Sequence, residues 1–254
     1  MAKNTSKSNA TAKITHRIAP IERIQTGTPG LDKLIQGGFV RNSTILLRGD
    51  TGTGKTIFSL QYLYYGAVNY DEPGMYISFS EPVETIKQHG ISFGWDMDKL
   101  EDEHKLVITK QEPHEVVNRL SQGGGSLRDV VESIGAKRLV IDSLTAYEMV
   151  FENKYKANES VLELFEFLRK WNSTAVVTSE FPVTPQHESG GRLGFLTDGI
   201  INFYHIRQNA HRVRALEIIK MRDTAHKDEI YVFDIGNGGL KLTGQVKVTR
   251  GEKK

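Results

Sequence analysis

The chain has 254 residues, of which 38% are hydrophobic and 25% are charged, and it contains no cysteine. These proportions are ordinary for a globular protein and leave room for one large α/β domain or two small ones. Without cysteine the chain has no disulfides, thiolate metal sites or cysteine nucleophiles, which agrees with a reducing compartment.

The sequence shows neither a membrane segment nor a secretion signal. No apolar run approaches the roughly 18 residues of a membrane-spanning helix, and residues 1–20 lack the apolar core of a signal peptide. Those residues are basic and rich in Ser and Thr, as transit peptides are, but they show no amphipathic face, so we expect a disordered tail. We therefore expect a cytoplasmic protein without membrane insertion.

The formal net charge of +2 is unevenly distributed along the chain. Residues 1–20 carry +4 and residues 244–254 carry +3, so residues 21–243 carry −5. A mildly acidic body makes nucleic acid a possible but not a favoured partner. We expect one domain over 21–243 between two disordered basic tails, which either solubilise the chain ends or contact an acidic partner.

The first predicted elements lead up to a glycine-rich loop. A turn at 28–30 precedes a short helix over 31–35, which the glycines at 37–38 end. The apolar run at 45–47 has the composition of a strand. After residue 56, apolar residues continue in a helical rhythm to about Asn69.

The segment between this strand and this helix matches the phosphate-loop pattern G-x-x-x-x-G-K-[ST] without a mismatch. Glycines let backbone N–H groups turn toward phosphate oxygens, and a helix N-terminus favours an anion. Lys55, a cation expected to face solvent, would reach the β- and γ-phosphates of ATP, and the Thr56 hydroxyl would ligate Mg²⁺. The predicted ATP-binding residues are Gly49, Asp50, Thr51, Gly52, Thr53, Gly54, Lys55, Thr56 and Ile57.

Strands and helices alternate through the middle of the chain. Glycines at 123–125 divide the helical region 112–134 into two helices, or into a helix and a mobile loop. Residues 91–96 read as a loop with Trp95 as a core anchor, and the polar segment 181–193 reads as a mobile loop. The predicted strands are 75–79, 105–109, 138–142 and 174–178, and the other predicted helices are 82–89 and 158–171.

The last third of the chain predicts β-hairpins. Residues 199–206 pair with 213–221, and residues 229–235 pair with 240–242. Together, the elements predict an α/β fold in which a mostly parallel sheet, flanked by helices, is extended at one edge by C-terminal antiparallel hairpins.

Candidate functional residues fall where predicted strands end. Ligands of open parallel sheets bind at the carboxyl ends of the strands, and Gly49, Glu81, Asp142 and Ser179 each fall at such an end. We therefore expect them to meet in one place. Because an acid that ends a buried strand can hold Mg²⁺ opposite a phosphate loop, Asp142 joins Thr56 as a predicted metal ligand.

Further stretches between about Thr26 and His226 carry the pattern of one family. They are TGTPGLDKLIQGGFVRNSTILLRGDTGTGKT, MYISFSEP, ISFGWDMDKLEDEHKLVI, RLVIDSLTAY, VVTSE and LEIIKMRDTAH. In these stretches and in their order, the chain resembles single-domain, archaeal-type members of the KaiC-like branch of RecA-type ATPases. The resemblance implies a RecA-like core that takes ATP and Mg²⁺, and homo-oligomeric rings, commonly hexamers, with ATP between subunits.

The resemblance also implies a role for two basic residues on a late strand. In that family a K-x-R pair reaches the γ-phosphate bound by the next subunit, and Lys220 and Arg222 fall at those positions. A cation from a neighbouring subunit would neutralise charge on the γ-phosphoryl group in the transition state. The alternative is an edge strand with solvated basic residues.

The chain departs from the family after its second predicted strand. The family usually has two glutamates there, either of which serves to activate water, whereas this chain has Ser80 and Glu81. A Ser hydroxyl is no base at neutral pH, so we expect hydrolysis to rest on Glu81 alone or to be slow. The chain has a single ATPase domain and no Ser-Thr pair that matches the clock protein's phosphorylation sites, so a circadian role is not carried over.

The histidines show no metal-ligand spacing and read as surface or packing residues. His226 is set apart because it lies in the matched DTAH stretch. The histidines considered are His89, His104, His114, His187, His211 and His226.

Three functions remain open, in this order of preference. The first is an oligomeric ATPase whose cycle drives changes in an unknown protein partner. The second is a nucleotide-gated module whose bound state is the signal and whose hydrolysis is negligible. Ser80 and Glu81 are the residues that distinguish it from the first, and a phosphate-release assay decides between the two. The third is a recombinase-like DNA-binding filament, which the acidic body disfavours and a salt-dependent DNA-binding measurement tests.

Overall fold

The protein is described by a computed structural model over residues 20–121, 125–185, 193–208 and 211–246. Most of the two predicted tails therefore lies outside the described residues. The same holds for 122–124, which include two of the three glycines at 123–125, and for 186–192, within the predicted mobile loop.

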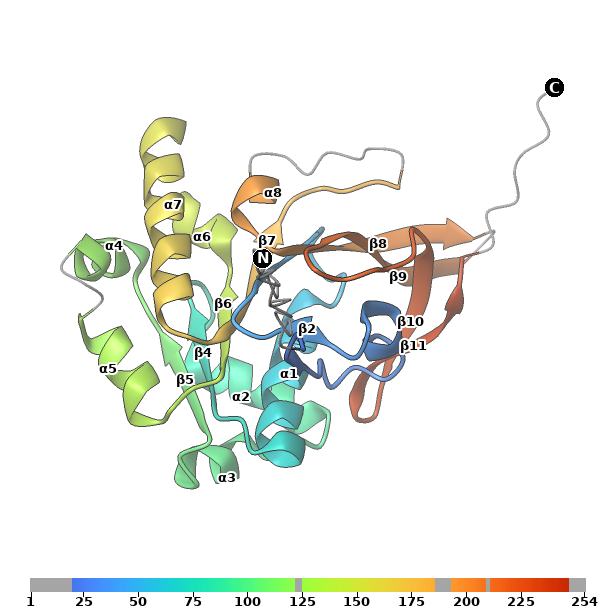
Figure 1. Ribbon diagram of the computed structural model, residues 1–254, viewed down its shortest axis with the longest axis horizontal. Helices are drawn as coiled ribbons and strands as arrows, with labels where there is room; N and C mark the ends of the chain where they lie inside the picture. The colour runs from blue at the N-terminus through green and yellow to red at the C-terminus, as the bar shows by residue number, and fades with distance from the viewer. Residues whose placement is uncertain (1–19, 122–124, 186–192, 209–210, 247–254) are drawn as a thin grey trace, which may run out of the picture.

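The core of the fold is a nine-stranded sheet. Its strands are β3 (Thr44–Gly49), β4 (Gly74–Ser78), β5 (Leu106–Lys110), β6 (Arg138–Asp142), β7 (Thr174–Glu180), β8 (Gly199–Gln208), β9 (His211–Met221), β10 (Ile230–Gly236) and β11 (Gly239–Gln245). They lie in the order β11-β10-β9-β8-β3-β7-β6-β4-β5. Strands from β8 to β5 pair in parallel, whereas β8, β9, β10 and β11 pair antiparallel (Figure 1). The predicted mixed sheet is confirmed.

Helices cover both faces of the parallel part of the sheet. One face carries α1 (Lys55–Tyr70), α2 (Val83–Ser92) and α3 (Met97–Asp102), which share a hydrophobic core cluster with the short helix η1 (Asp32–Ile35). The other face carries α4 (Pro113–Ser121), α5 (Gly125–Ser133), α6 (Leu144–Glu148) and α7 (Lys154–Lys170), which form a second cluster. Because both faces are covered, β3 is buried along its whole length.

Several elements differ from the sequence prediction. The predicted loop at 91–96 begins only after Ser92, because α2 continues to that residue, and Trp95 is buried as expected. Helix α7 begins before the predicted residue 158, because the side chain of Asn153 caps it by accepting a hydrogen bond from the Lys156 N–H (3.0 Å). The region 112–134 forms two helices, which is the first of the two predicted alternatives.

Short elements were not predicted. They are the helices α3, α6 and α8 (Leu193–Leu196) and the two-stranded sheet of β1 (Arg23–Ile24) and β2 (Phe39–Val40). None of the helices in the described part of the chain is both long and apolar enough to cross a membrane.

A buried cation joins the parallel sheet to helix α1. Arg138, at the start of β6, is fully buried and donates two hydrogen bonds to Glu72 Oε2 (2.6 and 2.9 Å). It also donates to the carbonyls of Gln25 and Tyr62 (2.8 Å each) and lies 4.6 Å from the centre of the Tyr62 ring. Its charge is therefore both paired and hydrogen-bonded, as burial requires.

Candidate functional site

The phosphate loop joins the end of β3 to the first residue of α1, as the sequence predicts. Gly52 and Gly54 have φ angles of 78° and 107°, in the left-handed region that favours glycine. At Gly49 a Cβ atom would lie 2.3 Å from the carbonyl oxygen of Phe203 on β8. The loop therefore needs glycine both for its backbone turns and for its close contact with the sheet.

Lys55 does not face solvent, and that expectation is wrong. The residue is 7% exposed, and its ammonium donates hydrogen bonds to the carbonyls of Gly49 (2.8 Å) and Asp50 (3.0 Å). Burial lowers the pKa of Lys55, while the carboxylates of Glu180, Asp142 and Asp50 act in the opposite direction. The side chain folds over the loop because loop carbonyls satisfy its N–H donors.

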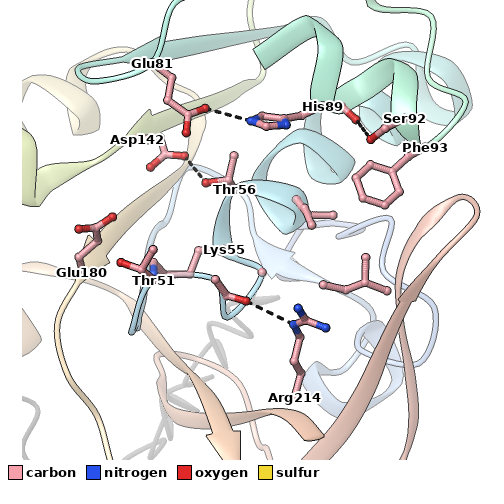
Figure 2. Close-up of a pocket in the computed structure, with 14 residues that line it drawn as sticks. Thr51, Lys55, Thr56, Glu81, His89, Ser92, Phe93, Asp142, Glu180 and Arg214 are labelled. Atoms are coloured by element: carbon pink, nitrogen blue, oxygen red, sulfur yellow. Dashed lines mark hydrogen bonds and ion pairs between the residues drawn. The ribbon is translucent and has the colours of Figure 1, made fainter. Parts of the chain in front are cut away.

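Asp142 accepts hydroxyl hydrogen bonds from three elements. Its Oδ2 accepts from Thr56 of α1 (2.8 Å) and Tyr76 of β4 (2.5 Å), and its Oδ1 accepts from Thr178 of β7 (2.6 Å). Burial, and then the Asp142 carboxylate, raise the pKa of Tyr76 well above its ordinary value, so the phenol stays a donor. The two residues predicted to hold a metal, Thr56 and Asp142, are in direct contact (Figure 2).

Glu81 lines the same cavity from the turn after β4. The Ser78 hydroxyl holds this turn by donating to the Glu81 carbonyl (2.8 Å) and accepting from the Glu81 N–H (2.9 Å). The Glu81 carboxylate lies 3.2 Å from His89 Nε2 on α2. Ser80 is exposed and is not among the described residues that line the cavity. His89, expected to be a surface or packing residue, belongs to the cavity wall.

The cavity has a volume of about 350 Å³ and draws on elements far apart in the sequence (Figure 2). Besides residues of the phosphate loop, Phe93 and Arg214 line the cavity. Arg214 Nε lies 3.3 Å from the carbonyl oxygen of Gly52. The lining residues are Thr51, Gly52, Gly54, Lys55, Thr56, Ile57, Glu81, His89, Ser92, Phe93, Asp142, Glu180, Arg214 and Ile235.

The expected convergence holds for Glu81 and Asp142 but not for Ser179. Strand β7 extends to Glu180, two residues beyond the predicted end, and side chains alternate along it. Thr178 therefore contacts Asp142 and Glu180 lines the cavity, while Ser179 Oγ lies 3.5 Å from the Thr145 hydroxyl. Ser179 is not among the described residues of the cavity wall.

Lys220 and Arg222 lie away from the phosphate loop of their own chain. The Lys220 ammonium donates to the carbonyls of Gly194 and Thr197 (2.6 Å each), and Arg222 donates to Asp198 Oδ1 (3.0 Å). Burial, and then the Arg222 charge, lower the pKa of Lys220. Arg214 of the cavity wall precedes Lys220 by six residues on β9, which corresponds to roughly 20 Å along a strand.

Several residues that line the cavity or donate hydrogen bonds to Asp142 were missed in the sequence. Tyr76, Thr178, Glu180 and Arg214 come from strands whose neighbours are known only once the sheet order is known. The available signal is alternation, because Tyr76 and Thr178 lie on the same face of the sheet as Asp142 when β4, β6 and β7 are placed side by side.

Comparison with known proteins agrees with this geometry. The family model for the KaiC ATPase matches residues 24–247. The UPF0273 protein MJ1359 of Methanocaldococcus jannaschii is 33% identical over 234 residues, which cover 87% of this chain and 96% of that protein. The crystal structure of the KaiC-like protein PH0186 from Pyrococcus horikoshii OT3 has a TM-score of 0.79 and 35% identity, and the match covers 88% of this chain and 100% of that one. The predicted RecA-like core is thereby confirmed.

A longer relative matches over part of its length. The circadian clock oscillator protein KaiC of Prochlorococcus marinus subsp. pastoris is 33% identical over 230 residues, which cover 87% of this chain and 45% of that protein. The chain spans about half the length of the curated KaiC relatives that it matches. Since the family model extends over nearly all the described residues and MJ1359 matches almost from end to end, this chain belongs to the KaiC family of ATPases.

Proposed function

We propose that this chain is a cytoplasmic, Mg²⁺-dependent ATPase that hydrolyses ATP slowly within a homo-oligomeric ring and regulates a protein partner through its nucleotide state. The observation that carries the proposal is the contact between the Thr56 hydroxyl and the Asp142 carboxylate (2.8 Å) beside the phosphate loop. This pair supplies the two oxygen ligands with which phosphate-loop proteins hold Mg²⁺.

The residues of the loop fit a bound triphosphate. Backbone N–H groups of the loop and the N-terminus of α1 receive the phosphates. The Lys55 ammonium exchanges its carbonyl contacts with Gly49 and Asp50 for oxygens of the β- and γ-phosphates. Thr56 and Asp142 would hold Mg²⁺, which would supply positive charge against the charge that develops during transfer.

Glu81 is the base of the proposed reaction. Its carboxylate lines the cavity and is 44% exposed, so it is accessible to a water molecule. That water attacks the γ-phosphorus in line with the departing ADP and gives its proton to Glu81. Ser80 is exposed. The family usually has two glutamates at these positions, whereas this chain has one, and the missing glutamate supports slow turnover.

The ring is proposed because Lys220 and Arg222 do not reach the loop of their own chain. Arg222 is about half exposed, with 48% of its side chain accessible, and so is available to a neighbouring subunit. Cations supplied from a neighbour accelerate phosphoryl transfer by about 10³ to 10⁵ in related NTPases. Assembly and hydrolysis would thus be coupled through one strand, β9.

A nucleotide-gated module with negligible hydrolysis is the second candidate, and the substitution of Ser80 for a glutamate favours it. Both candidates require ATP binding, but they differ in phosphate release. In the slow-ATPase proposal the purified chain releases phosphate with Mg²⁺, and Glu81→Gln lowers the rate of release by about 10²-fold or more. In the module, release is at background in both proteins while ATP still changes the particle mass.

The deciding experiment combines calorimetry, particle mass and phosphate release. We expect wild-type chain to bind ATP with Mg²⁺ and to assemble, and Lys55→Ala to lose most of the affinity while thermal unfolding shows a folded protein. Asn69→Ala, an exposed position on the same helix, is the control. Unchanged ATP affinity in Lys55→Ala would contradict the assignment of the loop.

A further inference from the structure

Two side chains at the rim of the cavity face each other in Figure 2. His89 Nε2 lies 3.2 Å from Glu81 Oε2, and the two side chains are 43% and 44% exposed. Both line the cavity that also contains Lys55 and Thr56. The contact therefore lies where Glu81 would meet a water molecule in the proposed reaction.

Separate anchors hold the two residues. The Ser78 hydroxyl fixes the backbone of Glu81 through two hydrogen bonds. On α2, Ile86 is fully buried, and a Cβ atom at Gly90 would lie 2.7 Å from the Met97 side chain, so this helix packs closely against α3. The position of His89 relative to Glu81 is thus set by the packing of the fold.

Other charged groups near the pair have their own partners or lie deeper in the cavity. In the described residues, Glu81 is the acid within hydrogen-bonding distance of the His89 ring. The remaining groups on the surrounding elements are Lys55, Asp142, Glu180 and Arg214 in the cavity, Lys87 with its partners Asp98 and Glu101, and Lys110 near Glu112.

We propose that His89 is a positioning residue for Glu81. The inference rests on the proposed ATPase function. The neutral imidazole donates its Nε2–H to one carboxylate oxygen of Glu81 and leaves the other oxygen free to accept the proton of the attacking water. His89 thereby fixes which oxygen acts as the base.

The test compares His89→Ala with His89→Gln in steady-state phosphate-release assays. We expect His89→Ala to lower kcat about 10-fold or more, because a misplaced catalytic group can lose up to about 100-fold. The ATP KM should change less than about 2-fold, since the phosphates are held by the loop. His89→Gln keeps a side-chain N–H donor, so it should restore the rate.

The controls separate positioning from a structural effect. Gln88 is exposed on the same helix, and Gln88→Ala should leave kcat unchanged. In a Glu81→Gln background, His89→Ala should have no further effect, because the two residues act as one unit. Thermal unfolding of each variant reports whether the fold is kept.

The outcomes distinguish this inference from the proposed function. If Glu81→Gln lowers turnover and His89→Ala does not, the positioning role is overturned and the ATPase stands. The role is also overturned if His89→Ala slows the Glu81→Gln protein equally, or if His89→Gln does not restore the rate. A wild-type chain that releases no phosphate overturns both.

Discussion

At the scale of single residues, the site is organised by one carboxylate with several hydroxyl donors. Thr56, Tyr76 and Thr178 belong to a helix and two strands, and all three donate to Asp142. Such partners orient a carboxylate before a metal arrives, so less conformational freedom is lost on binding. The Tyr76 phenol is buried and makes the shortest of the three contacts, at 2.5 Å.

Tyr76→Phe should therefore weaken Mg²⁺ binding without removing a ligand. Loss of a hydrogen bond that orients a metal-binding group lowers metal affinity by about 10- to 100-fold, and we expect about 10-fold here. The measurement is the Mg²⁺ dependence of ATP binding by calorimetry. Tyr204→Phe is the matched control, because Tyr204 is also buried and donates to a carboxylate, Glu217 (2.6 Å), outside the cavity wall. Equal effects of the two substitutions would contradict a role of Tyr76 at the metal site.

The pair Ser80 and Glu81 carries a second prediction at this scale. Glu81 faces the cavity and Ser80 is exposed, so Glu81→Gln should lower single-turnover hydrolysis by about 10²-fold or more. Ser80→Glu should raise the rate, because the chain turns at this point and a second carboxylate would gain access to the attacking water. A fast wild type that Ser80→Glu leaves unchanged would defeat the proposal of slow turnover.

At the scale of elements, helix α1 is fixed against the sheet by polar contacts as well as by apolar packing. Gln61 is fully buried; its Nε2 donates to the carbonyls of Gly27 and Leu240 (2.9 Å each), and its Oε1 accepts from the Leu240 N–H (2.6 Å). One turn further on, Gly66 leaves room for the Arg138 guanidinium. The helix that begins at the phosphate loop is therefore tied to both the β10–β11 hairpin and β6.

Gly66→Ala should destabilise the fold through Arg138. A Cβ atom at this position would lie 2.3 Å from Arg138 Nε, so the buried guanidinium would have to move away from Glu72. Disturbing a buried ion pair lowers the free energy of unfolding by about 3–5 kcal/mol when one partner is lost, and overpacking by about 1–3 kcal/mol, so we expect about 3 kcal/mol. Urea unfolding without nucleotide measures this loss in the free energy of unfolding.

Asn69→Ala is the control for this substitution, because Asn69 is exposed on the same helix. Its effect should stay within about 0.5 kcal/mol, as is usual for surface positions. If Gly66→Ala is as stable as the control, the tight fit around Arg138 does not contribute to stability as described.

The sequence predicts those elements and site residues whose pattern is contained in a few adjacent residues. The parallel strands are buried on both faces, so their apolar runs identify them directly. The phosphate loop, Asp142 and Glu81 are recognised because their chemistry is contained in a few adjacent residues. Helices α3 and α6 are too short for a periodic signal, although capping by Asp96 and Ser143 marks their starts.

The rest of the cavity could not be predicted because it depends on the order of the strands. His89 joins Glu81 through the placement of α2, and Arg214 reaches the loop because β9 extends past the end of β3 through β8. The burial of Lys55 likewise depends on how the loop carbonyls are arranged. Sequence motifs identify the chemistry, and the sheet topology determines which additional side chains surround it.

At the scale of the whole molecule, strand β9 connects the cavity with the region proposed to contact a neighbouring subunit. Arg214, near its first residue, contacts the phosphate loop, and Lys220, near its last, contacts carbonyls at α8 and just after it. Figure 1 shows the hairpin of β8 and β9 extending from the parallel part of the sheet. A rigid strand of this kind would link the nucleotide site of one subunit to the cations it offers to the next.

The last prediction tests whether Arg222 acts across a subunit interface. Arg222→Ala subunits should bind ATP with nearly unchanged affinity, because Arg222 is not among the described residues that line the cavity of its own chain. Rings of the variant alone should hydrolyse ATP at least about 10³-fold more slowly than wild-type rings, as for other cations supplied in trans. In mixed rings, each variant subunit inactivates the neighbour's site and leaves its own loop intact.

A mixing experiment measures whether a variant subunit inactivates the site of its neighbour. Arg222→Ala is combined with a Lys55→Ala variant, so that one subunit lacks the trans cation and the other lacks the phosphate-loop ammonium. If the cation acts in trans, mixed rings regain activity at those interfaces where an intact loop faces an intact Arg222, although neither variant is active alone. Arg128→Ala, which removes an exposed arginine paired with Glu132 on α5, should behave as wild type in every mixture. If Arg222→Ala rings are fully active alone, or if mixing the two inactive variants restores nothing while they co-assemble, Arg222 does not act across the interface.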